Sequence, residues 1–145
     1  MNNSRIKQLY REVILKHDRE PVNFEKWEDA PIIIEAHNPI CGDRFTLYLD
    51  ISDGIVQKAS FHGYGCAISK AATSMLVARI NGKPIVDILA LCDQYKPLLD
   101  PKAPEPEGID AELAAFMSAR IFPARLKCAS LSWEELERYL RDVGC

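Results

Sequence analysis

Three of the five cysteines in the sequence stand beside residues that can change the chemistry of a thiol. The first, Cys41, is followed directly by Gly42 and Asp43. A thiolate and a carboxylate this close together can bind one metal ion if the glycine between them allows a sharp turn. Taken alone, the same residues also fit a buried thiol beside a carboxylate in a solvated turn, which is the commoner arrangement.

The second and third candidates are Cys66 and Cys128. Cys66 follows Gly-Tyr-Gly at 63–65 and is predicted to begin a helix, where the helix dipole favours a thiolate. This position suits a metal ligand or a reactive thiolate, and it equally suits an inert cysteine at a helix start. Cys128 follows Arg125 on a predicted helix, so a cation lies on nearly the same face. For Cys128 by itself, a core cysteine is the simpler interpretation.

The intervals between these cysteines do not match zinc fingers or ribbons, which use paired C-x-x-C ligands. Spacing therefore allows a site assembled from distant segments without requiring one. Cys92 shares a helical apolar face and is expected in the core, and Cys145 is the last residue, with no role assigned. His37 and His62 each precede a candidate cysteine and can serve as spare ligands or proton relays, although a histidine on a strand surface is commoner.

The composition limits what the chain can be. Its 145 residues fit one domain, and 48% of them are hydrophobic, which is enough to bury a core. A formal net charge of -3 and the lack of a basic stripe argue against nucleic-acid binding. The charged N-terminal segment lacks the apolar stretch of a secretory signal, and no apolar run is long enough for a membrane span. We therefore expect a cytoplasmic protein without membrane contact, whose cysteines are thiols rather than disulfides.

The first half of the chain predicts a helix followed by three strands. Apolar residues recur at helical spacing over residues 6–17. Residues 32–37 are rich in β-branched side chains, residues 45–51 alternate apolar and polar, and residues 55–61 return after a Ser-Asp-Gly hairpin signal. These segments predict a small antiparallel sheet with one face covered.

The second half of the chain predicts helices. Helical periodicity runs through residues 68–96, and one apolar face continues over residues 123–143. A capping box at Ser132 and Glu135 would split the last helix in two, but the unbroken apolar face favours a single helix. Residues 97–119, which begin with a cluster of prolines, are expected to form an exposed insert, in which Asp110 can cap a short helix through Ala119. The predicted fold class is α+β: a small three-stranded antiparallel sheet with helices packed on one face.

Three motifs resemble, in order, those of the N-terminal family of IscU and NifU iron–sulfur assembly proteins. They are Asn-Pro-Ile-Cys-Gly-Asp at 38–43, Gly-Tyr-Gly-Cys-Ala-Ile-Ser at 63–69 and Arg-Leu-Lys-Cys-Ala at 125–129. The resemblance spans most of the chain, from the first predicted helix to the last. Each motif alone is weak, whereas three of them in the same order are specific.

Within this family the chain most resembles the SufU branch. IscU scaffolds have a histidine directly before the third cysteine, and this sequence has Lys127 there. They also carry a Leu-Pro-Pro-Val-Lys chaperone motif just upstream, where this chain has Phe-Pro-Ala-Arg at 122–125. The stretch at 97–119 is similar to the extra segment that SufU members carry between the second and third cysteines.

The resemblance implies a single zinc-binding sulfur-acceptor domain over residues 1–145. It implies zinc bound by Cys41, Asp43, Cys66 and Cys128, with Cys41 as the acceptor thiol. It also implies a SufS-type cysteine desulfurase as sulfur donor and a downstream acceptor of sulfur or of a cluster. The expected function is that of a zinc-dependent sulfurtransferase in iron–sulfur cluster biogenesis.

Two alternatives remain open. The same four side chains can hold a [2Fe–2S] cluster, which would make the protein a scaffold for cluster assembly and transfer. Lys127 in place of histidine weighs against this alternative. The other alternative is a zinc-stabilised interaction module without transfer chemistry, in which the site is closed and inert. In each zinc-binding case, Arg125 is expected to balance charge near the ion.

Overall fold

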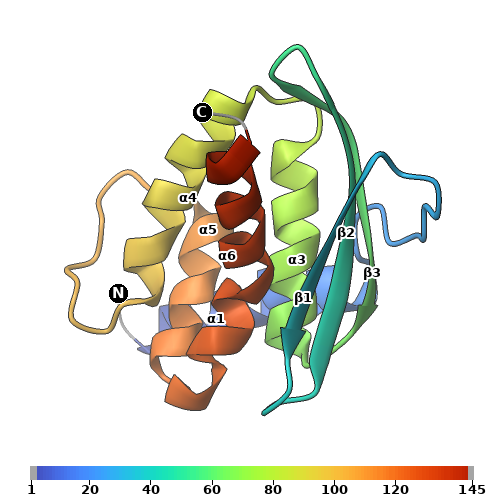
Figure 1. The fold of residues 1–145 in the computed structure, drawn as a ribbon. Coiled ribbons are helices and arrows are strands. Elements are labelled where there is room, and N and C mark those ends of the chain that lie inside the picture. Colours follow the sequence, from blue (N-terminus) through green and yellow to red (C-terminus); the bar gives the residue numbers. More distant parts are fainter. Residues whose placement is uncertain (1–2, 144–145) are drawn as a thin grey trace.

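The computed structural model describes residues 3–143, and a three-stranded antiparallel sheet forms one side of it. β1 (Ile32–Asn38), β2 (Asp43–Ser52) and β3 (Ile55–Tyr64) follow one another both along the chain and across the sheet (Figure 1). The β2–β3 hairpin turns at Asp53 and Gly54, whose φ angles of 55° and 72° suit a two-residue turn of the primed type. The predicted sheet is confirmed.

Helices cover one face of this sheet (Figure 1). The three longest are α3 (Ala67–Ile80), α4 (Ile85–Leu99) and α6 (Leu126–Val143). Phe45, Leu47 and Leu49 alternate along β2 and are fully buried, together with Met75 and Leu76 of α3. Side chains at alternate strand positions point to the same face, so one apolar row of β2 is buried under the helices. The predicted α+β architecture is therefore confirmed.

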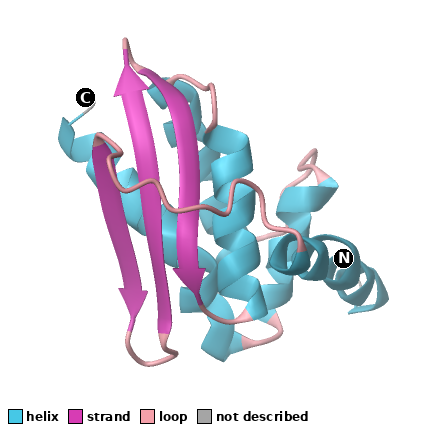
Figure 2. Cartoon of the chain, turned by 90° about the vertical axis from the view of Figure 1, so that its right-hand side faces the viewer, coloured by secondary structure: helices cyan, strands magenta, loops and turns pink. Residues whose placement is uncertain are grey.

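The segment between α2 and β1 crosses the opposite face of the sheet (Figure 2). The backbone N–H of Glu25 donates to Phe61 O at 2.9 Å, and the N–H of Phe61 donates to Asn23 O at 3.1 Å. Phe24 stacks on His62 with ring centroids 4.6 Å apart. The crossing segment thus pairs with the edge strand β3, and His62 packs against an aromatic ring.

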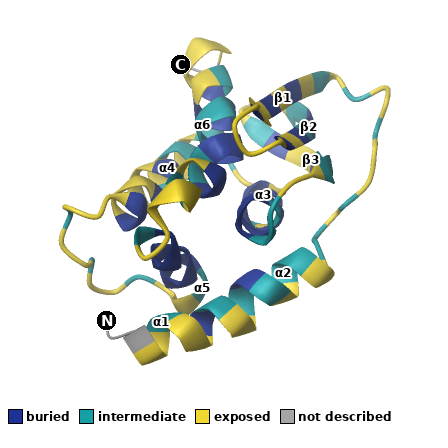
Figure 3. Cartoon of the chain, turned by 90° about the horizontal axis from the view of Figure 1, so that it is seen from below, coloured by how far each residue is buried: buried dark blue, intermediate teal, exposed yellow. Residues whose placement is uncertain are grey.

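The predicted N-terminal helix is confirmed, and it is continuous. It consists of α1 (Asn3–Leu9), a π-helical turn η1 (Tyr10–Ile14) and α2 (Leu15–Arg19), which together we call the N-terminal rod. Seen from below in Figure 3, the rod lies along the edge of the helical layer. Leu9 and Ile14 are its most buried residues, and they join the common core.

The insert predicted to be exposed over residues 97–119 is exposed only in its first part. α4 extends into it, and the loop at 100–110 lies mostly in solvent. Two short helices follow, α5 (Ala111–Ala114) and the 3-10 helix η2 (Ala115–Arg120). Phe116 of η2 is 0% exposed and packs edge-on against Tyr95, with ring centroids 5.9 Å apart. The prediction is wrong for residues 113–119 because this mostly apolar run packs against α4 and the N-terminal rod.

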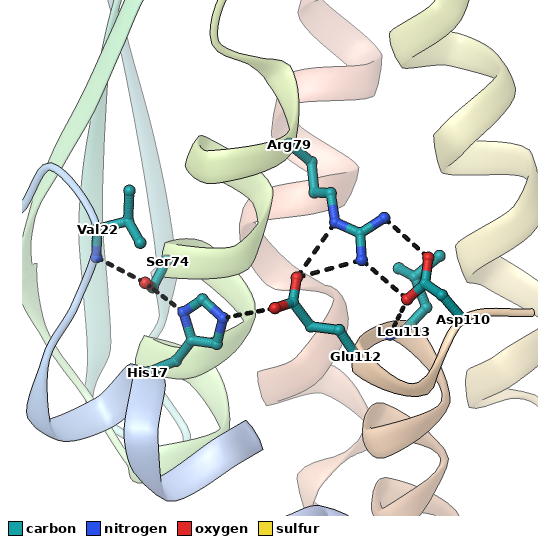
Figure 4. Close-up of polar contacts among 7 residues, drawn as sticks. All are labelled: His17, Val22, Ser74, Arg79, Asp110, Glu112 and Leu113. Carbon is teal, nitrogen blue, oxygen red and sulfur yellow. Dashed lines mark hydrogen bonds and ion pairs between the residues drawn. The ribbon is translucent and has the colours of Figure 1, made fainter. Parts of the chain in front are cut away.

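A polar network attaches the N-terminal rod to the helical layer (Figure 4). His17 Nδ1 lies 2.7 Å from Ser74 Oγ of α3, and His17 Nε2 lies 3.4 Å from Glu112 Oε2 of α5. Arg79 then bridges Glu112 and Asp110, at 3.2 and 2.8 Å. Three segments that are distant in the sequence are therefore joined through side chains.

α6 is a single helix, as predicted, and a 3-10 turn η3 (Pro123–Arg125) precedes it. The predicted start at Pro123 is therefore too early, since α6 begins at Leu126. Ser132 does not cap a second helix: its hydroxyl lies 2.7 Å from Thr73 Oγ1 and connects α6 to α3. Within residues 3–143, none of the helices has the length and apolar character needed to cross a membrane.

Candidate metal centre

Three segments that are far apart in the sequence meet at the lower end of the molecule in Figure 1. They are the loop between β1 and β2, the N-terminus of α3 and the first turn of α6. Cys41 of the loop and Asp43 at the start of β2 meet Cys128 of α6, and their ligand atoms all lie within 4.8 Å of one another. Two sulfur atoms and a carboxylate oxygen are thus close enough to share one ion.

Asp43 is held firmly and is 0% exposed. Its Oδ1 accepts hydrogen bonds from the backbone N–H of Cys66 at 3.0 Å and from the hydroxyl of Ser69 at 3.1 Å. Its Oδ2 is buried and has no hydrogen-bond partner within residues 3–143. A buried carboxylate oxygen without a partner is costly, and a metal ion would remove that cost. This oxygen is the structural feature that best fits a bound cation.

Cys128 is 1% exposed and lies in the first turn of α6. Burial raises the pKa of its thiol well above the usual range, and the neighbouring Asp43 carboxylate and the charge of Cys66 raise it further. Near neutral pH the thiol therefore stays protonated unless a cation stabilises the thiolate. A divalent metal ion deprotonates a coordinating thiol outright.

Cys66 is placed differently from the other predicted ligands. It is the half-buried N-cap residue of α3, and its Sγ accepts from the backbone N–H of Ser69 at 3.4 Å. It lies outside the group formed by Cys41, Asp43 and Cys128. Cys66 nevertheless adjoins that group, because its own N–H holds Asp43 and its charge acts on Cys128.

Two glycines give the backbone the freedom that this arrangement needs. Gly42 has a φ of 73°, a left-handed conformation that lets the chain turn between Cys41 and Asp43. At Gly65 a Cβ atom would lie 2.5 Å from Ser69 Oγ and 2.6 Å from Asp43 Oδ1. Any side chain at Gly65 would therefore displace the carboxylate or its hydrogen-bond partner.

Two basic residues near Cys128 have different surroundings. Arg125 is exposed, and hydrogen bonding to the Cys128 thiol, followed by the charge of Cys66, raises the pKa of Arg125. Lys127 pairs with Glu134 on the exposed side of α6, with Nζ and Oε2 2.6 Å apart. Arg125 is thus the cation placed to balance charge beside the thiols.

Among the described residues, Cys92 and the three histidines are not members of this group. Cys92 is 2% exposed in the core, as predicted, where burial and then the charge of Glu137 raise the pKa of its thiol to about 12. His37 is on the exposed side of β1, with its Nδ1 3.4 Å from Arg44 Nη2. Cys145 lies outside the described residues.

Ser69 is a member of the site that the sequence pattern does not reveal. It is 1% exposed in the first turn of α3, where its hydroxyl contacts Asp43 and its backbone N–H contacts Cys66. Serine is common near helix starts for reasons of helix stability alone, so its type and position carry no special signal. Only its place at the end of the motif at 63–69 links it to the cysteines.

The chemistry of the side chains favours zinc over a harder cation. Thiolate sulfur suits zinc or an iron–sulfur cluster, whereas Mg²⁺ and Ca²⁺ take oxygen ligands. Structural zinc sites are tetrahedral, and Cys41, Asp43 and Cys128 offer two sulfur atoms and one oxygen within reach of one ion. These three residues therefore fit zinc chemistry, and a fourth ligand would have to come from an adjoining group such as the Cys66 thiol.

Comparisons with known proteins agree with this chemistry. The family described as NifU-like N terminal domain matches residues 9–138. The chain is 37% identical to the zinc-dependent sulfurtransferase SufU of Bacillus subtilis over 137 residues, which cover 94% of this chain and 92% of that protein. It is 34% identical to the iron-sulfur cluster assembly scaffold protein IscU of Thermotoga maritima over 138 residues, 95% of this chain and 96% of that one. The crystal structure of an N-terminal NifU-like protein from Brucella abortus has the same fold, with a TM-score of 0.81 at 23% identity over 96% of both chains.

Proposed function

This chain belongs to the family of NifU-like N-terminal domains, which serves iron–sulfur cluster assembly, and we propose that it acts there as a zinc-dependent sulfurtransferase. The observation that carries the proposal is the convergence of Cys41, Asp43 and Cys128, together with a buried Oδ2 of Asp43 that has no hydrogen-bond partner among the described residues. The printed name of the Bacillus subtilis relative supports the same choice. The proposed functional unit is the whole chain, residues 1–145, with the loop at 100–110 as the exposed part of its insert.

The proposed zinc ligands are Cys41, Asp43, Cys66 and Cys128. When bound, zinc would keep the thiols deprotonated at neutral pH. Asp43 and Cys128 are buried, whereas Cys41 is exposed. Cys66 would complete the set by turning its Sγ away from the Ser69 amide. We expect Cys41 to be the ligand that leaves the zinc ion most easily, because its side chain is the most exposed of the four.

Cys41 is the proposed sulfur acceptor because it is exposed and lies next to Gly42 in a tight turn. Its thiolate would attack the terminal sulfur of a cysteine persulfide on the donor enzyme. A new S–S bond forms on Cys41, the S–S bond of the donor breaks, and the electron pair leaves with the donor's cysteine thiolate. The transfer moves neutral sulfur, so it needs no external oxidant or reductant. A downstream acceptor of sulfur or of a cluster would then take the group.

The proposed donor is a SufS-type cysteine desulfurase. Exposed apolar side chains stand beside the candidate ligands: Ile40 is 93% exposed next to Cys41, and Tyr64 is 63% exposed at the end of β3. Phe122 is also half exposed and contacts Tyr10 of the N-terminal rod, with ring centroids 6.5 Å apart. Apolar and aromatic exposure next to a reactive site is typical of protein interfaces. The proposed docking surface therefore combines the Cys41 loop with parts of the N-terminal rod and of η3 and α6.

The test is a desulfurase assay with the purified full-length protein. The wild-type protein is expected to contain zinc, to raise turnover of a SufS-type enzyme and to gain the mass of a sulfur atom. Cys41→Ala is expected to abolish sulfur acceptance, whereas the core variant Cys92→Ala should keep it. Full stimulation by Cys41→Ala would refute the acceptor role. Zinc binding with a Cys41 thiol that resists alkylation would favour the inert interaction module instead.

A second candidate function is the [2Fe–2S] scaffold, which the name of the Thermotoga maritima relative favours. The same sulfur ligands suit such a cluster. Visible absorption distinguishes the two functions, because a zinc protein is colourless and a cluster protein is not. If the protein purified without oxygen is coloured and contains iron and sulfide in place of zinc, the scaffold function would be favoured over the sulfurtransferase function.

A further inference from the structure

We propose that Ser69 is a positioning residue of the metal centre, whose hydroxyl orients the Asp43 carboxylate so that Oδ2 alone faces the ion. The inference rests on the proposed function, because it concerns the same zinc site. It adds a residue that is not itself a ligand. A positioning role also accounts for a polar side chain in the first turn of α3 that is 1% exposed.

Ser69 contacts two of the four proposed ligands at once. Its hydroxyl lies 3.1 Å from Asp43 Oδ1, and its backbone N–H donates to Cys66 Sγ at 3.4 Å. The second contact comes from the main chain and does not depend on the side chain at this position. The hydroxyl also accepts a long hydrogen bond from the Cys66 thiol at 3.5 Å, which Cys66 would give up on turning toward zinc. The contact with Asp43 is therefore the part that depends on serine when zinc is bound.

The hydroxyl has one proton and two acceptors within reach, Asp43 Oδ1 at 3.1 Å and the carbonyl oxygen of Cys66 at 3.0 Å. The Cys66 carbonyl already accepts the backbone N–H of Lys70 at 3.0 Å. A charged carboxylate oxygen is also the stronger acceptor. The proton is therefore assigned to the bond with Asp43.

This bond completes the hydrogen bonding of one carboxylate oxygen and leaves the other free. Oδ1 accepts the N–H of Cys66 and the O–H of Ser69, and a carboxylate oxygen has two lone pairs to offer. Oδ2 has no partner among the described residues, so both of its lone pairs are available to a cation. The missing side chain at Gly65 provides the room in which Ser69 and Asp43 meet.

Loss of the hydroxyl would leave Asp43 with a single hydrogen bond on Oδ1 and free its carboxylate to rotate. Partners that orient a metal ligand typically contribute 10- to 100-fold in metal affinity. We expect Ser69→Ala to weaken zinc binding about tenfold while it leaves the number of zinc ions bound unchanged.

Zinc affinity can be measured on the full chain by competition with a chromophoric chelator. The matched control is Ser132→Ala, which also removes a buried hydroxyl from the helical layer but contacts Thr73 rather than Asp43. This control is expected to bind zinc as the wild-type protein does. An equal loss of affinity in Ser69→Ala and Ser132→Ala would overturn the positioning role.

A double-mutant cycle distinguishes positioning from a general structural effect. If Ser69 acts through Asp43, the double variant Asp43→Ala/Ser69→Ala binds zinc no more weakly than Asp43→Ala alone. A structural role would instead add its own loss to that of Asp43→Ala, and this outcome would overturn the proposal.

A second pair of variants keeps the test valid if Ser69→Ala does not fold. Ser69→Thr and Ser69→Val have nearly the same shape and differ in the hydroxyl, so the threonine variant should bind zinc about tenfold more tightly. Equal affinities in this pair would refute the role of Ser69 and leave the zinc site intact. Failure of the wild-type protein to bind zinc would instead overturn the proposed function itself.

Discussion

The carboxylate of Asp43 is asymmetric: Oδ1 accepts two hydrogen bonds, whereas Oδ2 has no hydrogen-bond partner among the described residues. A side chain at Gly65 would disturb this arrangement, because a Cβ there would lie 2.6 Å from Asp43 Oδ1. We expect Gly65→Ala to destabilise the fold by about 1–3 kcal/mol through overpacking and to weaken zinc binding. Urea denaturation and chelator competition measure the two effects. Unchanged zinc affinity would show that the position of Oδ1 does not matter to the site.

Arg125 offers a separate test of the electrostatics around Cys128. Its exposed guanidinium is placed to stabilise the thiolate, so Arg125→Ala is expected to weaken zinc binding about threefold, as befits an exposed charge. The control is Arg138→Ala, which removes an exposed arginine of α6 that pairs with Glu135 at 2.6 Å. Equal zinc affinities in the two variants would show that the charge of Arg125 does not contribute to zinc binding.

Single residues also show what the sequence can and cannot tell about the candidate site. Cys41, Asp43 and Cys128 were assigned through family resemblance, because no spacing rule links ligands that come from three distant segments. Their convergence depends on how the sheet and helices pack, which is not encoded at the three positions themselves. Ser69 is harder still to predict, since its function depends on one contact with Asp43 and not on its residue type.

Among the elements, the N-terminal rod is attached by the charged network of Figure 4. His17, and then Arg79, lower the pKa of Glu112, and Arg79 lowers the pKa of Asp110. Because the folded pKa values lie below the ordinary ones, the stabilisation is complete above about pH 5. It is lost as the pH falls through the lowered folded values.

Arg79→Met should therefore unfold at lower urea concentration than the wild-type protein at pH 7, and the two should converge in acid. The Asp110 side chain is 49% exposed, so screening by solvent limits the difference at pH 7 to about 1 kcal/mol. Urea midpoints measured across the acid range test this, with Arg138→Met as the surface control. A gap that stayed constant at every pH would mean that ionised Asp110 and Glu112 do not contribute.

The elements themselves were largely predictable. The three strands and the long helices follow the hydrophobic periodicity of the sequence. Each of these elements buries one face, so the apolar residues that reveal it in the sequence are the residues that pack in the fold. The insert is predictable only in part. Its prolines correctly indicate the loop at 100–110, and Asp110 correctly indicates the cap of the short helix that follows, but the apolar run at 113–119 does not by itself show that it is buried. The burial of this run depends on a gap between α4 and the N-terminal rod that only the assembled fold contains.

For the whole molecule, a bound zinc ion would connect the β1–β2 loop, the start of α3 and α6. A ligand that binds only the native state stabilises it by about 2.7 kcal/mol at 100 times its Kd. We expect a strong chelator to lower the melting temperature of the wild-type protein, and to lower that of Asp43→Ala by less. Thermal unfolding with and without chelator tests this. An unchanged wild-type melting temperature would contradict a zinc ion that joins these segments.

The meeting of three distant segments at one end of the fold also has a consequence during protein synthesis. Cys41, Asp43 and Cys66 leave the ribosome well before Cys128, whose helix comes last in the chain. A nascent polypeptide therefore has an incomplete set of ligands until α6 has been synthesised. Tight metal loading should then be confined to chains that include α6, so translation products that are truncated before it would not compete for zinc.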